Sequence, residues 1–398
     1  MRSLKDLDLK NKTVFLRVDL NVPLEKETGR IRDDTRIQAV LPTLNYLIDQ
    51  QAKIVAASHL GRPSGKFNPQ LSLKPVANRL RELLSTKVIL APDVIGNQVE
   101  KLKRELNQGD ILLLENLRFY PGEKANDPTF AQALASNIEA YVNDAFGACH
   151  RAHASIVGLP QLVAQKGAGF LLEKEIRNLE KLIHQPEKPF VAILGGAKVA
   201  DKIPIIKNLL TKAAAMLIGG GMAYTFFLAL GHEVGNSLID QESLSVCREL
   251  LNFAQQNKVE LLLPVDHLVA PSLQDIQEIL VVEDFPFPPQ MRGLDIGPQT
   301  RELYAQKIKS ARTIFWNGPM GVFEVPEFAQ GTMVIAQAIA SAQAFSVIGG
   351  GDSVAAVTQA GVTDQISHIS TGGGASLEYL AYETLPGLEA LKEKSNEK

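Results

Sequence analysis

The sequence predicts an α/β protein of two domains, each a mainly parallel, Rossmann-like β-sheet covered by helices, with a hinge helix joining them. Three observations predict this class. The chain has 398 residues, more than one ordinary domain. Short apolar runs alternate with helix-length segments along its whole length. Most of these runs are apolar on both faces, which is typical of parallel strands buried between layers of helices.

The expected strands follow one another at spacings that leave room for a crossover helix between them. In the first half they cover residues 13–18, 53–58, 87–92 and 111–116, and in the second half residues 190–194, 214–220, 259–264, 313–316 and 345–350.

A boundary between the halves is expected at a single amphipathic helix. Residues 171–184 place Leu172, Ile176, Leu179 and Ile183 at helical spacing, and the following "QPEKP" ends the pattern. We therefore expect domains over 1–170 and 186–383 with a hinge over 171–185, and a tail over 384–398 that packs back on the first domain. An ordinary surface helix is the alternative interpretation of this segment.

The composition favours a globular protein that binds small molecules. Apolar residues make up 45% and charged residues 21% of the chain, and the net charge of -3 argues against nucleic acid as a partner. No apolar run is long enough for a membrane span, and the N-terminal segment lacks the apolar stretch of a signal peptide. Cys149 and Cys247 show no metal-ligand spacing, which indicates a reducing compartment and a cytoplasmic protein.

Polar side chains gather where the strands of the first half end. Eleven of the sixteen arginines precede residue 171, and Arg is the preferred side chain for holding carboxylates and phosphates. The strand from residue 13 alternates, so that Arg17, Asp19 and Asn21 share one face. Further candidates follow the later strands or begin the first helix: Arg36, His59, Arg62, Arg118, His150, Arg151 and His153.

Together these residues predict a basic pocket for a small, multiply anionic molecule. Three alternatives are an edge strand with its polar face in water, a solvated arginine surface, and a zinc site on His59, His150 and His153. The zinc interpretation is disfavoured because the neighbouring arginines would repel a cation and no HExxH or Cys/His pair occurs.

Four glycine-rich turns mark the second half, beginning at residues 193, 217, 347 and 369. Each leads from a strand into a helix, where bare N–H groups attract anions. Tight turns without a ligand are the alternative. No turn matches the Walker pattern or G-x-G-x-x-G followed by an acid, which disfavours a P-loop ATPase and a simple dehydrogenase.

Three charged residues sit in these turns. Lys198 and Lys202 are expected on one face at a helix start, where lysines oppose the helix dipole and suit a polyphosphate. Asp352, in "VIGGGDSV", either favours the helix N-terminus as a first-turn acid or holds a Mg²⁺ ion that contacts phosphate.

Ten segments, in order, resemble the phosphoglycerate kinase family along essentially the whole chain. They are "FLRVDLNVP", "DDTRI", "SHLGRP", "LLLENLRFYPGE", "VNDAFGACHRAHAS", "ILGGAKVADKI", "GLDIGP", "WNGPMGVFE", "VIGGGDS" and "STGGGAS". The chain departs from the family pattern at Ala148 and Cys149, where a Thr-Ala pair is common, and in "EYLAYETLPG" near the end.

The resemblance implies reversible phosphoryl transfer between 1,3-bisphosphoglycerate and MgADP, giving 3-phosphoglycerate and MgATP, by a cytoplasmic monomer whose domains close without using a general base. It implies a glycerate site of Asp19, Asn21, Arg36, His59, Arg62, Arg118 and Arg151. It implies a nucleotide site of Lys198, Lys202, Gly293, Asn317, Glu324, Gly350, Gly351, Asp352 and Ser353, with Asp352 on Mg²⁺. Arg36, Lys198, Gly373 and Gly374 would be catalytic. A dehydrogenase and a nucleotide-binding regulator without chemistry are the alternatives on the same fold.

Overall fold

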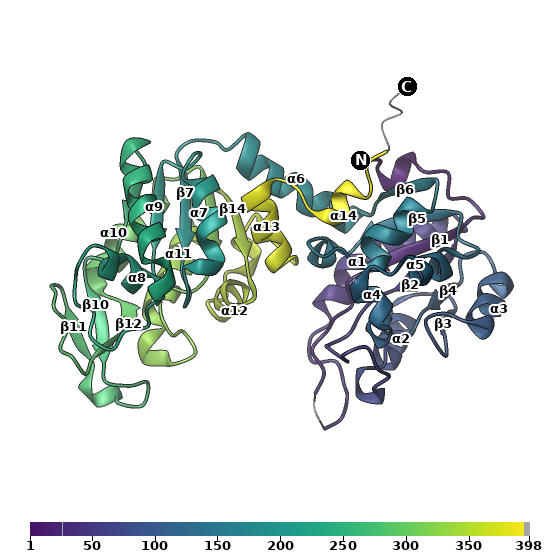
Figure 1. The fold of residues 1–398 in the computed structure, drawn as a ribbon, viewed down its shortest axis with the longest axis horizontal. Coiled ribbons are helices and arrows are strands. Elements are labelled where there is room, and N and C mark those ends of the chain that lie inside the picture. The colour runs from purple at the N-terminus through teal and green to yellow at the C-terminus, as the bar shows by residue number, and fades with distance from the viewer. Residues whose placement is uncertain (26, 394–398) are drawn as a thin grey trace. The chain divides into compact units, whose positions relative to one another are not determined.

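The chain is described by a computed structural model over residues 1–25 and 27–393. Its internal contacts divide it into two compact units. The first comprises Met1–Ile176 together with the described part of the segment that begins at Thr384, and the second comprises Arg177–Glu383 (Figure 1).

The first unit contains a six-stranded sheet in the order β3-β4-β2-β1-β5-β6, and every neighbouring pair of strands is parallel. Its strands are β1 (Thr13–Val18), β2 (Lys53–Ala57), β3 (Val88–Leu90), β4 (Ile111–Leu113), β5 (Ala140–Asp144) and β6 (Gln165–Ala168). Its helices are α1 (Thr35–Asp49), α2 (Lys74–Leu83), α3 (Asn97–Glu105), α4 (Pro121–Ala125), α5 (Pro128–Ala135) and α14 (Pro386–Glu389). α6 (Phe170–His184) begins in this unit and ends in the second.

The second unit contains another parallel six-stranded sheet, in the order β15-β14-β13-β7-β8-β9. Its strands are β7 (Phe190–Leu194), β8 (Ala215–Ile218), β9 (Glu260–Leu262), β13 (Thr313–Asn317), β14 (Phe345–Gly349) and β15 (His368–Ile369). Its helices are α7 (Ile203–Leu209), α8 (Met222–Ala229), α9 (Leu244–Gln256), α10 (Pro298–Lys309), α11 (Gln330–Ser341), α12 (Gly351–Gln359) and α13 (Gly374–Tyr382). A separate antiparallel sheet, β11-β10-β12, is formed by β10 (His267–Ala270), β11 (Leu280–Val282) and β12 (Arg292–Ile296).

Hydrophobic burial explains the two large sheets. β4, β5, β7 and β13 are buried at every position, and helices lie on both faces of each sheet (Figure 1). Burying apolar surface on both faces stabilises parallel strands, and continuous apolar runs are the sequence pattern that this requires. The predicted class, two α/β units with mainly parallel sheets, is confirmed.

β1 lies at the centre of its sheet, so the edge-strand interpretation of its alternating pattern is wrong. Its Arg17 is 1% exposed and therefore faces the interior of the unit and not water. Because the carboxyl ends of parallel strands meet at one edge of a sheet, the residues that follow β1, β2, β4 and β5 are brought together there.

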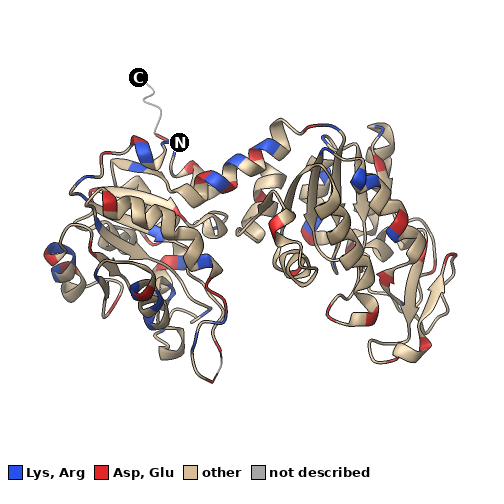
Figure 2. Cartoon of the chain, turned by 180° about the vertical axis from the view of Figure 1, so that it is seen from behind, with Lys and Arg blue, Asp and Glu red and all other residues tan. Residues whose placement is uncertain are grey.

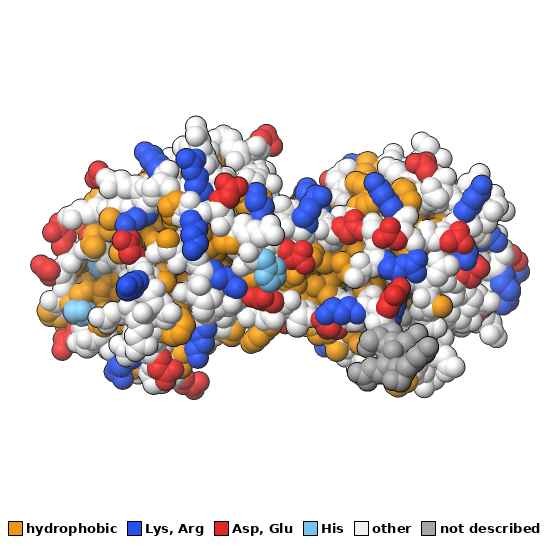
Figure 3. Space-filling model, turned by 90° about the horizontal axis from the view of Figure 1, so that it is seen from above, with side chains coloured by type: hydrophobic (Ala, Val, Ile, Leu, Met, Phe, Trp, Pro, Cys, Tyr) orange, Lys and Arg blue, Asp and Glu red, His pale blue; other side chains and the backbone are white. Residues whose placement is uncertain are grey.

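Charged side chains of both signs are interspersed over both units (Figure 2). On the face shown in Figure 3, Lys and Arg likewise alternate with Asp and Glu, and no extended basic surface forms. Within the described residues, no helix is long and apolar enough to cross a membrane.

Candidate active site

α1 brings Arg36 of the first unit onto Asp19, which follows β1. Arg36 Nη1 donates a hydrogen bond to Asp19 Oδ2, and the Asp19 side chain is only 11% exposed. Burial opposes the charged form of Asp19, but the Arg36 and Arg17 guanidinium groups hold the pKa of this carboxyl below its ordinary value. The Arg36 side chain remains 37% exposed, and its guanidinium has further donors for a ligand.

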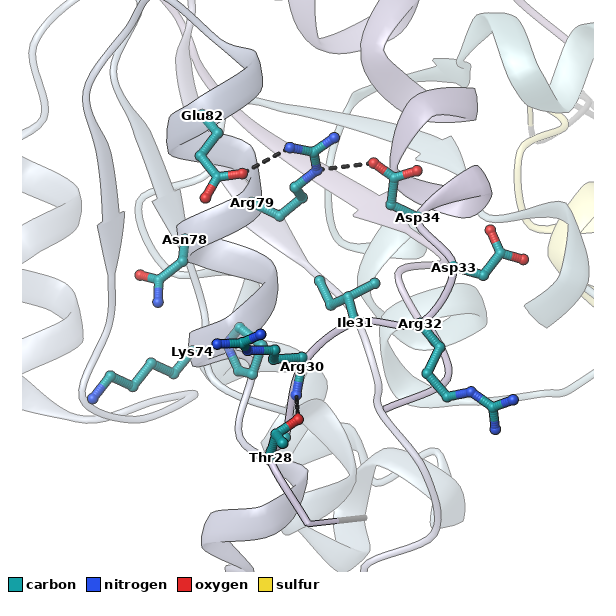
Figure 4. A pocket seen from close by; sticks show the side chains of 12 residues that line it. Thr28, Arg30, Ile31, Arg32, Asp33, Asp34, Lys74, Asn78, Arg79 and Glu82 are labelled. Carbon is teal, nitrogen blue, oxygen red and sulfur yellow. Dashed lines mark hydrogen bonds and ion pairs between the residues drawn. The ribbon is translucent and has the colours of Figure 1, made fainter. Parts of the chain in front are cut away.

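The acids at the start of α1 are engaged elsewhere, which rules out a surface pair between them and Arg36. Asp33 Oδ1 accepts from the backbone N–H of Thr35 at 2.8 Å. Asp34, the N-cap residue, accepts from Arg79 Nε at 2.9 Å, and Arg79 also contacts Glu82. These residues line a cavity of about 900 Å³ beside α2 (Figure 4). This cavity contains none of the predicted site residues, but its Arg79–Asp34 pair fixes the first turn that carries Arg36.

The turn after β2 is connected to two other predicted residues through Gly61. The Gly61 N–H donates to Asn21 Oδ1 at 2.8 Å, and the Gly61 carbonyl accepts from Arg118 Nη1 at 2.8 Å. Gly61 has a φ of +62°, and a Cβ at this position would lie 2.7 Å from Leu71. Glycine therefore favours this close turn, which holds Asn21 and Arg118 at the same edge of the sheet.

His59 lies between Asp19 and Arg17. Its Nδ1 is 4.0 Å from Asp19 Oδ1 and 3.4 Å from Arg17 Nη2. Burial, and after it the neighbouring arginines, lower the pKa of His59 well below its ordinary value, so the imidazole is neutral at physiological pH. Its Nδ1 can then accept a hydrogen bond from Arg17.

Burial also lowers the pKa of Arg118 to about 10, with repulsion from Arg151 and Arg17 adding to the effect. Its Nε is buried without a hydrogen-bond partner. A buried, unpaired donor next to further guanidinium groups is typical of a site that receives an anion.

Two predicted arginines lie at the exposed rim and make no hydrogen bond to this cluster. Arg62, which follows Gly61, is exposed. Arg151 is also exposed, and its Nε lies 3.0 Å from Nε2 of His150.

The third histidine of this region, His153, is buried. Burial lowers its pKa to about 3, and its Nδ1 is 3.7 Å from Glu123 Oε1. No group of three or more His, Cys, Asp or Glu side chains among the described residues is placed to hold a metal ion.

The glycine turns of the second unit line two adjoining cavities. The first, of about 570 Å³, is the more polar of the two and is lined by Lys198, Lys202, Asn317, Gly350, Gly351, Asp352, Ser353, Gly373 and Gly374, among others. α12 and α13 both begin at this cavity, and no side chain caps either helix. Their first-turn N–H groups and helix dipoles therefore favour an anion in this cavity.

The second cavity, of about 660 Å³, is more apolar. Gly293, Glu324, Leu238 and Leu273 line it, and it shares Asp352 with the first cavity. The N–H of Gly293 donates to Ser237 Oγ at 2.9 Å. A Cβ at Gly293 would lie 1.9 Å from the ring of Tyr224, so this wall requires glycine because of the packing behind it. A polar and an apolar cavity side by side suit a molecule with phosphates at one end and a flat base at the other.

Asn317, at the end of β13, organises the polar cavity. Its Oδ1 accepts from Lys202 Nζ, and its Nδ2 donates to the carbonyl of Gly349 at 2.6 Å. Ser353 Oγ accepts from the N–H of Gly318 at 2.6 Å. Burial lowers the pKa of Lys202 to about 8, although Asp201 and Asp352 act against this shift.

The prediction that Lys198 and Lys202 share one face at the start of a helix is wrong. Lys198 is exposed in the loop after β7, and Lys202 is the N-cap residue of α7. A 3-10 helix, Ala200–Lys202, precedes α7, which begins at Ile203 with Pro204 at an early position where its missing N–H costs no hydrogen bond. Both lysines nevertheless line the same cavity.

Asp352 stands in the first turn of α12 and is not its N-cap residue, which is Gly350. Its side chain is exposed, and its carboxylate makes no hydrogen bond to any residue that the structure describes. Asp201 lines the same cavity. A free carboxylate beside a cavity that can hold phosphate fits Mg²⁺, which takes one or two carboxylates and completes its shell with water and phosphate oxygens.

The resemblance assigns no role to Arg17, although the alternation places it on the same face as Asp19. Its partners Ser155 and His59 lie 138 and 42 residues away, so only the folded sheet reveals the contact. The alternating pattern of β1, which places Arg17 on the face of Asp19, is the feature of the sequence that indicates Arg17 as a site residue.

The fold and the two candidate sites are typical of an α/β kinase, with a cluster of arginines in one unit and a cavity lined by glycine turns in the other. The family model for phosphoglycerate kinase matches residues 4–383. A phosphoglycerate kinase of Acidobacterium capsulatum is 54% identical over 98% of this chain and 99% of its own length, and one of Anaeromyxobacter sp. (strain K) is 51% identical over 99% and 100%. The structure of phosphoglycerate kinase from Coxiella burnetii aligns with a TM-score of 0.88 at 39% identity, covering 98% of both chains.

The chain belongs to the phosphoglycerate kinase family. It is an enzyme of glycolysis that transfers a phosphoryl group between 1,3-bisphosphoglycerate and a nucleotide, and its substrates are small molecules. Neither the dehydrogenase nor the regulator alternative is favoured by any of these similarities.

Proposed function

We propose that the cluster around Asp19 and Arg36 binds 3-phosphoglycerate and 1,3-bisphosphoglycerate, and that the glycine turns of the second unit bind ADP and ATP. The observation that carries this proposal is the gathering of the predicted residues at the carboxyl ends of the strands of two different sheets. Ligands of open α/β sheets bind at this edge.

In the proposed glycerate pocket, Arg62, Arg118 and Arg151 neutralise the phosphate and carboxylate charges of the substrate. The unpaired Nε of Arg118 supplies a donor that would otherwise remain unsatisfied. Asp19 and Asn21 have oxygen atoms that accept from substrate hydroxyl groups, and Asp19 also orients Arg36. His59 completes the wall of the pocket between Asp19 and Arg17.

In the proposed nucleotide site, Lys198, Lys202, Asn317, Ser353 and the N–H groups at Gly350 and Gly351 hold the phosphates, and Gly293 and Glu324 border the base and ribose. Asp352 would hold Mg²⁺, which when bound neutralises charge on the phosphate oxygens.

The reaction needs no general base, because the attacking or leaving group is a carboxylate that is already ionised at neutral pH. Catalysis then depends on alignment and on neutralising charge on the transferring phosphoryl group. We assign this neutralisation of charge to Arg36, Lys198 and the N–H groups of Gly373 and Gly374. Since the two sites belong to different units, transfer requires a closed state in which the units meet and exclude water from the acyl phosphate.

We further infer that the enzyme works as a monomer in the cytoplasm. Cys149 and Cys247 are both free and buried, as expected in a reducing compartment. Light scattering after size-exclusion chromatography measures the oligomeric state.

The variant Asp352→Ala tests the nucleotide assignment. We expect the KM for MgADP to rise roughly tenfold, the cost of one charge-assisted contact, while the KM for 3-phosphoglycerate stays within about twofold. Removal of a first-turn acid costs about 0.3–1 kcal/mol of stability if its role is only to favour the helix dipole. Equal loss for both substrates together with a lowered Tm would therefore assign Asp352 to folding and not to the metal.

A further inference from the structure

A fully buried carboxylate, Glu123, lies behind the proposed glycerate pocket. It belongs to the short helix α4, and its side chain is 0% exposed. Both of its oxygens accept hydrogen bonds from one residue: Oε2 from the Ser155 N–H at 2.9 Å and Oε1 from the Ser155 hydroxyl at 2.6 Å. A buried carboxylate is costly unless such bonds satisfy it, so this geometry is tightly specified.

Ser155 connects Glu123 to the residues of the proposed glycerate pocket. While its hydroxyl donates to Glu123, the same oxygen accepts from Arg17 Nε at 2.9 Å. Arg17 is 1% exposed, and its Nη2 lies 3.4 Å from Nδ1 of His59, which in turn borders Asp19. Hydrogen bonds therefore connect Glu123 through Ser155 to Arg17 and His59, and Nδ1 of His59 lies 4.0 Å from Asp19, the carboxylate that orients Arg36.

Two further contacts fix the same serine and the loop before it. Tyr141 on β5 donates its buried hydroxyl to the Ser155 carbonyl at 2.8 Å. The N–H of His153 donates to the carbonyl of Arg151 at 2.9 Å, so the rim arginine precedes Ser155 by one short turn. Anchoring Ser155 therefore constrains both the buried Arg17 and the backbone that presents Arg151.

The negative charge of Glu123 lies near two arginines in the interior of the first unit. Arg17 and Arg118 bring positive charge into the interior, and Asp19 faces them from the pocket side. Glu123 lies close enough to favour the charged form of Arg118. An interior cation requires a counter-charge, and Glu123 supplies one that reaches Arg17 through the Ser155 hydroxyl.

We propose that Glu123 is a positioning residue for the glycerate substrate, acting through Ser155 on Arg17 and on the loop of Arg151. This inference rests on the proposed function, because it presumes that the pocket binds the glycerate. Glu123 itself touches no substrate; it holds the guanidinium groups in the geometry that the substrate needs.

The test compares Glu123→Gln with Glu100→Gln in the full-length enzyme. Glu100 is a matched control, because it also joins a serine hydroxyl, that of Ser136 at 2.8 Å, to a buried cation, Lys103, but it belongs to α3 and is none of the proposed site residues. We expect Glu123→Gln to raise the KM and the calorimetric Kd for 3-phosphoglycerate roughly tenfold with less than a twofold change for MgATP. Glu100→Gln should lower the Tm without changing either constant.

Ser155→Ala removes the hydroxyl that joins Glu123 to Arg17 and is the milder change. It tests the positioning role of Glu123 if Glu123→Gln does not fold. It should also weaken 3-phosphoglycerate selectively, and the double variant should be no worse than the more affected single variant, since both remove one connection. A lowered Tm with unchanged Kd for 3-phosphoglycerate in the folded variants would overturn the proposal.

Arg118→Ala, measured in parallel, separates this outcome from failure of the pocket assignment. If Arg118→Ala weakens 3-phosphoglycerate binding and the Glu123 and Ser155 variants do not, only the positioning role is wrong. If Arg118→Ala binds 3-phosphoglycerate like the unchanged enzyme, the pocket assignment itself is wrong.

Discussion

The two sites hold anions by different physical means. In the first unit the candidate pocket is made of side-chain charges: Arg17 and Arg118 are buried, and Asp19 is nearly so. In the second unit the polar cavity is made largely of backbone: α12 and α13 begin there without side-chain caps, and Lys198 and Asp352 are exposed. Side chains dominate the first site, and helix N-termini dominate the second.

The difference teaches where each site is vulnerable. A site of buried guanidinium groups depends on the counter-charges that neutralise it, so single charge changes should be costly. A site of backbone N–H groups depends on the conformation of its glycines, so an added methyl group should damage it more than the loss of one exposed charge. The following changes would sharpen or break this comparison.

Arg36→Lys should have the largest effect. Lysine keeps the charge but loses the planar fork that contacts Asp19 and leaves further donors exposed. If Arg36 acts mainly in the transition state, kcat and kcat/KM should fall together by about 10² or more, with little change in the KM for nucleotide. Steady-state kinetics in both directions measure this, with the exposed Arg32→Lys as control. Turnover close to that of the unchanged enzyme would remove Arg36 from the catalytic set.

Arg118→Ala should chiefly affect ground-state binding of the glycerate. Loss of one charge-assisted contact costs about 1.5–3 kcal/mol, which corresponds to roughly a tenfold to hundredfold rise in the KM for 3-phosphoglycerate. The exposed Arg104→Ala on α3 removes the same charge away from the site and should leave this KM unchanged. An equal rise in both variants would mean that general electrostatic attraction, and not the pocket, accounts for the effect.

Gly350→Ala tests the backbone-built site. Gly350 has a φ of +90°, and a Cβ there would lie 2.5 Å from Asn317 Nδ2. We expect a stability cost of about 1–3 kcal/mol from backbone strain and a rise of roughly tenfold in the Kd for MgADP, because the turn must shift. Gly361→Ala, at a φ of +68° with no atom within 4 Å, imposes strain outside the site and should cost stability alone. Unchanged MgADP binding in Gly350→Ala would contradict the role of this turn.

The pH dependence of Lys202 should be the smallest effect. Burial lowers its pKa to about 8 in the folded protein from an ordinary value of 10.5. The unfolded chain therefore binds more protons between about pH 8 and 10.5, so the contribution of Lys202 to the free energy of unfolding rises with pH in this window. Affinity for ADP, which needs the ammonium group, should fall over the same range. Lys202→Met should flatten both trends; trends identical to those of the unchanged enzyme would show that other groups produce them.

Much of the architecture could be predicted from the sequence because buried parallel strands are continuous apolar runs. The runs at 13–18 and 190–194 coincide with β1 and β7. The small antiparallel sheet was not predicted, since β11 exposes Leu280 and Val281 and its pattern fits neither a buried nor an alternating strand. The spacing of Lys198 and Lys202 does not reveal that Lys198 lies in a loop and that a 3-10 helix, Ala200–Lys202, precedes α7.

The candidate residues themselves could be named from sequence motifs, but their support could not. Ser155 lies 32 residues from Glu123 and 138 residues from Arg17 along the chain. The three side chains meet only because the order of the strands brings them together. No local pattern encodes such a contact, because parallel sheets join segments that are distant along the chain.

Hydrogen exchange of the unchanged enzyme, followed by mass spectrometry with each ligand alone, tests the division of labour between the two units most directly. The account predicts that 3-phosphoglycerate protects amides at residues 19–21, 59–62, 116–119 and 149–155, and that MgADP protects those at 195–202, 317–320, 350–354 and 372–375. Protection of the second set by 3-phosphoglycerate, with the first set unchanged, would contradict it.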